Sequence, residues 1–226
     1  MKVRLTFIEE SLGSTPAKEN LLREYIVSKS SDPVKIEEEI AAHGVQAVED
    51  DRMTVFPRLA DGRPIFWDYQ IKGFLKDSWQ MLAKAGKAGY EGGWACSCIK
   101  AYKKTIDGLI FVFPRQIPIE MHGMKMDTCE RPLRASTPMG ERVSIAKSET
   151  VPEGSTLQFE ITCLDPHLEE CVIECLNYGK LRGLSQWRNS GKGRFTWERL
   201  DEPAEKPTKK RGKKKADETA EDDGEA

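Results

Sequence analysis

The sequence lacks any hydrophobic run that approaches the roughly 18 apolar residues needed to cross a bilayer. Its first residues also lack the apolar core of a secretory signal. Both absences indicate a cytoplasmic protein without a membrane partner. The six cysteines are therefore expected to be reduced thiols. We expect them to be ordinary buried side chains, with no metal and no other cofactor.

An excess of charge of one sign is also lacking, because the 226 residues carry a net charge of only −2. Residues 201–226 hold seven of the 35 Lys and Arg and nine of the 37 Asp and Glu, which leaves 28 of each in residues 1–200. A surface for nucleic acid must therefore be local. The segment 201–226 has no hydrophobic face and joins a basic run to an acidic end. This composition predicts a disordered charged tail.

What the sequence does contain is a succession of strand and helix patterns. Alternating or short apolar runs predict strands over 2–9, 54–56, 65–67, 109–113, 117–120, 155–163 and 194–200. Helical spacing and start signals predict helices over 17–29, 32–40, 71–84 and 165–178. A glycine-rich break is expected at 86–93, and a long loop or hairpin at 121–150.

The order of these patterns predicts an α+β fold with a ferredoxin-like (RRM-like) βαββαβ core. We expect one domain over 1–200, with inserted hairpin or loop excursions near 11–53 and 86–150. Two helices have clear apolar faces. Their predicted buried residues are Ile71, Phe74, Leu75, Ser78, Trp79 and Leu82 in the first, and Leu168, Val172, Cys175 and Leu176 in the second.

A glycine-rich basic loop lies between the last predicted helix and the last predicted strand. Its three glycines allow positive φ, so that backbone N–H groups can line a phosphate-binding concavity. Four cations supply charge to the same phosphates, and Trp187 offers a face on which a base can stack. The glycines are Gly183, Gly191 and Gly193, and the cations are Arg182, Arg188, Lys192 and Arg194. The alternative is a mobile connector whose cations keep it soluble.

Two further groups of cations are candidates for binding nucleic acid. Lys72, Gly73 and Lys76 open the predicted helix at 71–84, where a helix N-terminus can hold an anion, and Arg58 precedes them. The alternative there is an amphipathic helix with solvated lysines. A turn-rich stretch contains Arg131 and Arg134, which suit bidentate phosphate contacts or an acidic partner. That stretch could equally be a solubilising hairpin.

Several segments together resemble the RAMP superfamily, the repeat-associated RNA-binding proteins of CRISPR effector complexes. Residues 61–76 are similar to its D-G-x-P-Y-I-P-x-S-S-L-K-G-x-L-R signature. Residues 143–161 are similar to its V-x-I-D…V-P-x-G-T-x-F-x-F-x-I passage, and residues 183–195 to its C-terminal glycine-rich loop. The segments occur in the family order, and the best match is to the guide-RNA-binding backbone subunits of type III complexes. The chain also resembles proteins of bacteriophages and prophages of Gram-positive bacteria.

The resemblance implies a bacterial, possibly phage-encoded, protein that binds single-stranded RNA or DNA, with RNA as the first expectation. It also implies assembly side by side with copies of itself or with other effector-complex subunits. Residues 67–70 and the pair Ser185 and Gln186 depart from the family pattern. No catalytic residue can be carried over, so we expect no enzyme activity. Endoribonuclease activity is the alternative, with His122 as the one of the three histidines placed to reach a substrate.

Two other functions stay open on the sequence. One is a phage single-stranded DNA-binding or replication accessory. The other is a phage protein that uses the same fold to bind or inhibit a host protein.

Overall fold

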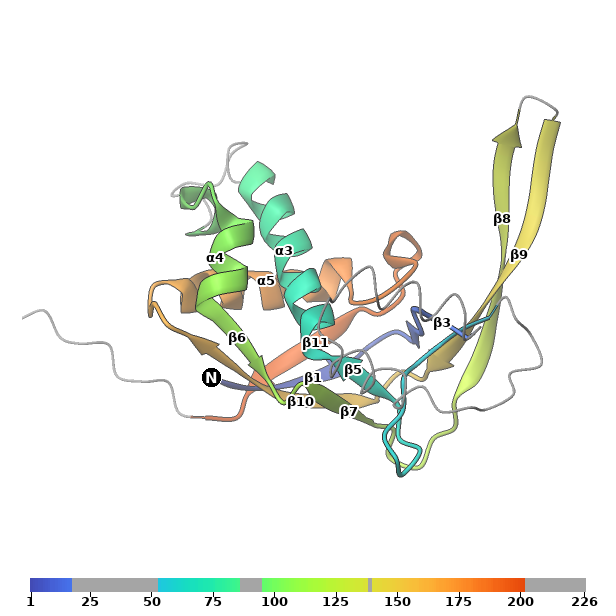
Figure 1. Cartoon of the computed structure of the whole chain (residues 1–226), viewed down its shortest axis with the longest axis horizontal. Helices are drawn as coiled ribbons and strands as arrows, with labels where there is room; N and C mark the ends of the chain where they lie inside the picture. The colour runs from blue at the N-terminus through green and yellow to red at the C-terminus, as the bar shows by residue number, and fades with distance from the viewer. Residues whose placement is uncertain (18–52, 86–94, 138–139, 202–226) are drawn as a thin grey trace, which may run out of the picture.

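The computed structural model describes residues 1–17, 53–85, 95–137 and 140–201 (Figure 1). The helices predicted over 17–29 and 32–40 and the glycine-rich break at 86–93 lie almost wholly outside the described residues. The predicted tail also lies outside them, except for its first residue, Asp201.

The main sheet has six strands with the order β11-β1-β10-β7-β5, and β6 also pairs with β10. Every pairing in it is antiparallel. The strands are β1 (Lys2–Phe7), β5 (Ile65–Trp67), β6 (Ile110–Phe113), β7 (Gln116–Glu120), β10 (Thr156–Cys163) and β11 (Phe195–Arg199). Strands β6 and β7 pair with successive parts of β10, so they share one position in the sheet.

Three helices lie over one face of this sheet (Figure 1). They are α3 (Asp68–Ala85), α4 (Tyr102–Leu109) and α5 (Leu168–Arg182), and two short 3-10 helices, η1 (Ala95–Cys98) and η2 (Arg188–Ser190), accompany them. Along the chain the core elements are β1, α3, the β6 and β7 pair, β10, α5 and β11. The protein is therefore an α+β protein, with its core elements in the order strand, helix, strand, strand, helix, strand.

The core lies between this sheet and the helices, where alternate strand residues and one face of each helix meet. Val3, Leu5 and Phe7 of β1 are buried. All six residues predicted for the buried face of α3 and all four predicted for α5 are also buried, which confirms both faces. Burial of this apolar surface is the main favourable contribution to folding.

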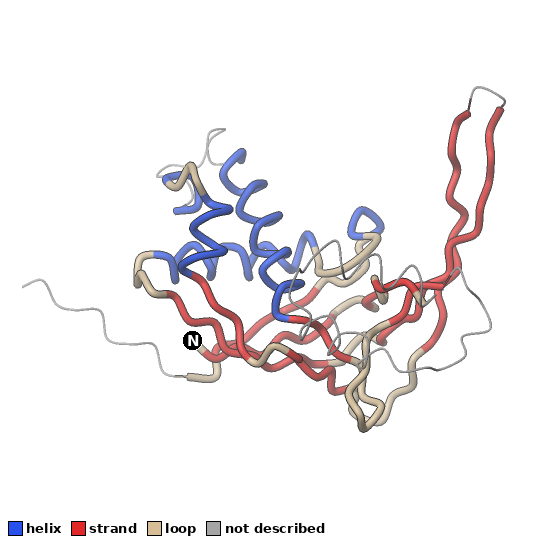
Figure 2. The backbone as a smooth tube through the Cα atoms, viewed as in Figure 1, coloured by secondary structure: helices blue, strands red, loops and turns tan. Residues whose placement is uncertain are grey.

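A second sheet has the order β2-β9-β4-β3, with β8 paired to β9. Its strands are β2 (Ser11–Leu12), β3 (Thr15–Pro16), β4 (Met53–Val55), β8 (Asp127–Thr137) and β9 (Gly140–Val151). Strands β8 and β9 pair from Asp127 with Thr150 out to Thr137 with Gly140. They form a hairpin that projects from the body of the molecule (Figure 2). The loop or hairpin expected at 121–150 is thus a long hairpin.

Three features differ from the sequence expectation. Helix α3 begins at Asp68 rather than at Ile71, and the backbone N–H of Trp67 just before it donates to the side chain of Gln70 at 2.8 Å. Helix α4 was not predicted, because it is short and, of its residues, buries only Ile106. Strands β6 and β7, at 110–120, belong to the main sheet although they fall within the expected insertion at 86–150.

Candidate nucleic-acid interface

The glycine loop after α5 is folded back on itself. Gly183, Gly191 and Gly193 all have positive φ, as expected. The N–H of Leu184 donates to the carbonyl of Gly193 at 2.8 Å and closes the loop. A Cβ at Gly193 would overlap the carbonyl oxygen of Leu184, and one at Gly183 would lie 2.5 Å from the carbonyl oxygen of Lys192. Gly183 and Gly193 are therefore required by the close packing of the loop backbone.

The glycine N–H groups do not line an open concavity, and this part of the prediction is wrong. Gly183 donates to the carbonyl of Gly179 at 3.0 Å, Gly191 to that of Arg188 at 3.0 Å, and Gly193 to that of Glu10 at 2.8 Å. The N–H groups of these three glycines are therefore used within the fold, as buried backbone donors are in nearly all proteins. A phosphate bound here would not be held by the N–H groups of the three glycines.

Three of the four loop cations are ion-paired with carboxylates from other elements. The Nε of Arg182 and the Nη1 of Arg188 both donate to Oδ2 of Asp77 on α3, at 3.1 and 2.7 Å. Lys192 pairs with Glu10, which follows β1. The hydrogen bond that Lys192 donates to Glu10 raises the pKa of Lys192, so this side chain is charged throughout the neutral range.

The fourth cation, Arg194, packs against the loop itself. A Cβ built on Gly191 would lie 3.3 Å from its Cζ. Its Nε is buried and has no hydrogen-bond partner among the described residues, and the same is true of the Nε of Arg131. Both guanidinium groups therefore retain unused hydrogen-bonding capacity in the free protein.

The hairpin brings Arg131 onto the loop. The Cζ of Arg131 lies 5.1 Å from the ring centroid of Trp187, within range of a cation–π contact. Its Nη2 donates to Oε1 of Gln186 at 3.0 Å. Trp187 has a left-handed backbone conformation with φ 52°, and its side chain is 38% exposed. Arg131 thus lies over the ring of Trp187, while more than a third of the surface of Trp187 is exposed to solvent.

We call these side chains the loop surface, defined as Arg131, Arg182, Trp187, Arg188, Lys192 and Arg194. Among the described residues, three of its five cations form ion pairs with two carboxylates, Asp77 and Glu10, and Glu9 also contributes to the raised pKa of Lys192. The loop surface is therefore locally basic although residues 1–200 are neutral overall. This is the local concentration of charge that the composition required of any nucleic-acid surface.

A cavity of about 300 Å³ adjoins the loop surface and links it to α3. Phe66, Phe74 and Leu184 give it an apolar part, and Gly73 and Arg188 are among its other lining residues. The remaining lining residues are Ser14, Gln70, Ser185 and Gln186. The two groups of residues predicted around Gly73 and around the glycine loop thus meet at one cavity.

Lys72 and Gly73 do not sit at a helix N-terminus, so the anion site expected from that geometry is wrong. Because α3 begins at Asp68, both residues lie in its second turn, where backbone N–H groups donate within the helix. A Cβ on Gly73 would meet nothing within 4 Å, so no close packing requires this glycine.

The remaining predicted cations lie apart from the loop surface, and three of these four have contacts elsewhere in the fold. The Nζ of Lys72 lies 4.9 Å from the ring centroid of Phe111 on β6. Lys76 pairs with Asp107 of α4 at 2.5 Å, and Arg58 pairs with Glu149 of β9. Arg134 lies further out on the hairpin and is exposed. These contacts hold elements of the fold together, and only Arg134 is presented to solvent without an ion pair in the described part of the chain.

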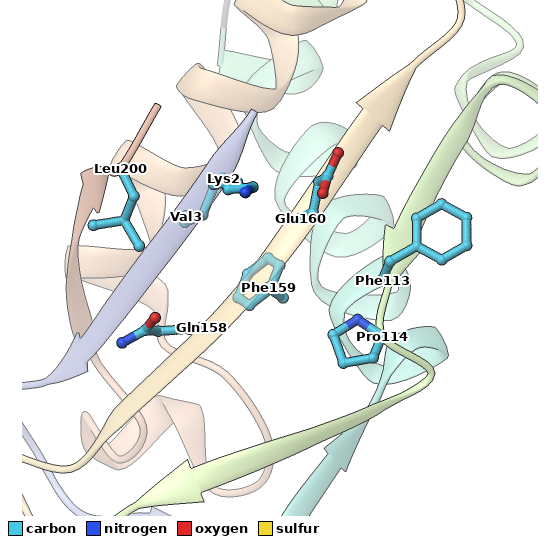
Figure 3. A pocket seen from close by; sticks show the side chains of 8 residues that line it. All are labelled: Lys2, Val3, Phe113, Pro114, Gln158, Phe159, Glu160 and Leu200. Carbon is cyan, nitrogen blue, oxygen red and sulfur yellow. The ribbon is translucent and has the colours of Figure 1, made fainter. Parts of the chain in front are cut away.

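A second cavity, of about 470 Å³, lies on the other face of the main sheet. Figure 3 shows its lining residues on β1, β6, β10 and the end of β11, with the helices behind the strands. Phe113 and Leu200 are 53% and 41% exposed and give it apolar walls, and Lys2, Gln158 and Glu160 give it a polar floor. None of the residues predicted from sequence to bind nucleic acid lines this cavity.

The described residues include His, Cys, Asp and Glu side chains, the usual metal ligands of proteins. No group of three or more His, Cys, Asp or Glu side chains there could hold a metal ion. His122 has φ 51°, and its Nε2 lies 3.0 Å from Oγ1 of Thr156, away from the residues of the loop surface. No helix in the described ranges is long and apolar enough to span a membrane.

Sequence reasoning missed the residues that organise the loop surface from outside. Asp77, Glu10 and Gln186 contact its cations directly. Asp77 is 105 and 111 residues from its two partners, and no local pattern links residues so far apart. Gln186 stood out only as a departure from the family's loop pattern.

No family model matches the sequence, and no curated protein matches it. Among solved structures, it is similar to a chain of the cryo-EM structure of the type III-B Cmr-β complex bound to cognate target RNA. The identity is 11% and the TM-score 0.46, over 88% of this chain and 58% of that chain. The chain thus spans less than two thirds of the length of that neighbour.

Two other solved structures are similar over nearly their whole length. The crystal structure of Cmr6 from Pyrococcus furiosus has 10% identity and a TM-score of 0.43, over 87% of this chain and 97% of that chain. A chain of a type IV-B CRISPR complex has 14% identity and a TM-score of 0.44, over 92% of this chain and 94% of that chain.

Proposed function

We propose that this protein binds single-stranded RNA through the loop surface, as a non-catalytic protein of RAMP type. The observation that carries the proposal is the contact of Arg131 from the hairpin with Trp187 of the loop, where its Cζ lies 5.1 Å from the ring centroid. Single-strand binding uses cations along the phosphates together with aromatic rings that stack on bases. The loop surface supplies both kinds of group side by side.

The charge of the loop surface supports contact with several phosphates at once. In the described part of the chain its five cations outnumber the carboxylates beside them, Asp77, Glu10 and Glu9, and each phosphate that the cations neutralise releases counter-ions from the strand. Guanidinium groups form strong, charge-assisted hydrogen bonds with phosphate. In Arg131 and Arg194 the Nε is buried, so such bonds would come from the terminal nitrogens of these side chains. The preference for RNA over DNA rests on the sequence resemblance to RNA-binding proteins.

Assembly side by side along the strand is part of the proposal, with the hairpin as the contact between neighbours. Leu133, Val143 and Ile145 of the hairpin are 50%, 63% and 57% exposed. In the antiparallel register Pro132 faces Ile145 and Arg134 faces Val143, so these four residues share one face of the hairpin. Exposed apolar side chains next to a cation suit contact with a second protein chain.

These exposed side chains also favour a second candidate function, in which the hairpin binds a host protein and nucleic acid is not the ligand. The second cavity, with its exposed Phe113 and Leu200, would then be a further contact surface. This candidate needs no contribution from the loop cations, which separates it from the first.

One titration distinguishes the candidates. The purified full chain is titrated against labelled single-stranded RNA, single-stranded DNA of the same sequence and the RNA duplex, by fluorescence anisotropy. We expect the tightest binding to single-stranded RNA, and intact RNA on a denaturing gel after incubation with Mg²⁺. Tighter binding to single-stranded DNA would favour the replication accessory. Absence of binding to all three would contradict the proposal and favour the protein partner.

A further inference from the structure

Two arginines of the loop surface, Arg182 and Arg188, share one counter-ion, the carboxylate of Asp77. Arg182 and Arg188 both donate to the same oxygen, Oδ2 of Asp77, at 3.1 and 2.7 Å. All three side chains are about a quarter exposed, with values of 25%, 27% and 23%. A carboxylate oxygen that accepts from two guanidinium groups occupies the position that a phosphate oxygen would take. The site is therefore already filled by an anionic group of the protein.

We propose that Asp77 competes with RNA phosphate for Arg182 and Arg188 and thereby sets the affinity of the loop surface. This inference rests on the proposed function and concerns the regulation of the same site. A phosphodiester carries the same single negative charge as Asp77, so an isolated anion that displaces the Asp77 carboxylate gains little binding free energy. A strand gains more binding free energy, because its other phosphates contact Arg131, Lys192 and Arg194. Asp77 thus favours strands of several phosphates over small anions.

The loop does not depend on Asp77 for its shape. Its closure uses the backbone hydrogen bond from Leu184 to Gly193 and the bond from Gly193 to Glu10, both 2.8 Å. The side chains of Ser185 and Gln186 add hydrogen bonds to the carbonyls of Leu12 and Gly13. These contacts remain when Asp77 loses its charge. A neutral residue at this position is therefore expected to free the arginines while the loop stays folded.

The test is the affinity of Asp77→Asn for single-stranded RNA, measured with the parent at several salt concentrations. We expect binding about fivefold tighter, the effect of one unit charge at roughly 4 Å in water-like surroundings, and a steeper salt dependence. Glu198→Gln is the matched control, because it changes the net charge equally and breaks a surface pair with Arg4 of the same 2.7 Å length. We expect the control to bind like the parent.

A double-mutant cycle separates competition from a general charge effect. In an Arg182→Gln/Arg188→Gln background, Asp77→Asn should leave the affinity unchanged, because its two partners are gone. A fivefold gain in that background would overturn the inference. Equal or weaker binding of Asp77→Asn in the parent background would also overturn it, and weaker binding would make Asp77 a positioning residue.

Two further measurements test the inference if Asp77→Asn fails to fold. Asp77→Ser removes the charge with a smaller side chain and should give the same gain. In the parent protein, the Nε–H resonance of Arg182 should move when RNA replaces Asp77, and an unmoved resonance at saturation would contradict the inference. If parent and Asp77 variants all fail to bind RNA, the proposed function itself is wrong. If the parent binds, Arg188→Ala weakens binding and Asp77→Asn changes nothing, only this inference is wrong.

Discussion

The glycine loop at 182–194 and the β8–β9 hairpin both place arginines beside apolar side chains, yet the two segments are held in different ways. The loop is closed by its own backbone, and three of its cations are paired with Asp77 and Glu10. The hairpin instead exposes Leu133, Val143 and Ile145 to solvent. A cationic, glycine-rich composition can thus belong to a packed part of a fold, while a polar, turn-rich one can form a regular but projecting arm.

The difference has an energetic consequence. Changes in the loop should affect both the free energy of unfolding and RNA binding, because its residues contact the core and, in the proposed function, contact the RNA. Changes in the outer hairpin should affect binding or assembly alone. The following predictions test this contrast, beginning with the largest expected effect.

Gly193→Val should destabilise the protein by about 3 kcal/mol or more, because the residue has φ 71° and its Cβ would overlap the carbonyl of Leu184. Gly73→Ala is the matched control, since its Cβ would lie in open space on α3. A helix-interior glycine replaced by alanine should raise stability by up to about 1 kcal/mol. Urea denaturation measures both. Equal stability of Gly193→Val and the parent would show that the loop is not packed as described.

Trp187→Ala should weaken single-stranded RNA binding by about 1–3 kcal/mol and leave the salt dependence unchanged, because stacking involves no counter-ion release. Trp197→Phe serves as the control. Trp197 lies on β11, outside the loop surface, and donates to Asn177 at 2.9 Å, so its replacement should leave binding intact. The comparison fails if the two variants lose the same affinity or if Trp187→Ala flattens the salt dependence.

Replacement of residues 133–144 by an Asn-Gly turn should change the free energy of unfolding by less than about 0.5 kcal/mol. The exchange keeps Arg131 and the Pro132 and Ile145 pair and removes the exposed outer part of the hairpin. Self-association on long RNA, followed by analytical ultracentrifugation, should decrease in the same variant. Marked destabilisation would mean that the arm packs on the body. Unchanged self-association would show that the outer hairpin is not the contact between neighbouring copies.

Deletion of residues 202–226 should have the smallest effect and leave the melting midpoint unchanged, because this segment has no apolar face to lose. The truncation keeps Asp201, which accepts a hydrogen bond from the backbone N–H of Lys2 at 2.6 Å. Differential scanning calorimetry of the two proteins is the measurement. A midpoint lower by more than a few degrees would show that the tail docks on the domain.

Much of the fold could be predicted because its signals are local. The spacing of Ile71, Phe74 and Trp79 defined the buried face of α3, and alternation around Phe159 defined β10. Helix α4 gave no comparable signal, since of its residues only Ile106 is buried. The start of α3 was misplaced because the bond from Trp67 to Gln70 depends on a single side chain.

The candidate site was predicted less completely, because its residues are local but their partners are not. Composition was enough to name Arg182, Trp187 and Arg188. It could not show that Asp77 neutralises two of the arginines or that Arg131 reaches Trp187, since these contacts join residues 55 or more positions apart. The N–H groups of the three glycines were assigned to phosphate because their backbone acceptors become evident only in the folded chain.

The most direct test of the central claim is the salt dependence of single-stranded RNA binding by the parent and by Arg188→Ala/Lys192→Ala. Removing one cation that binds a phosphate of a single strand should lower the slope of log affinity against log salt by roughly 0.7, or by about 1.4 for the double variant. The affinity should fall for all RNA sequences alike, since phosphate contacts carry no sequence information. If the double variant binds as tightly as the parent at moderate salt with the same slope, the loop surface is not the RNA-binding site.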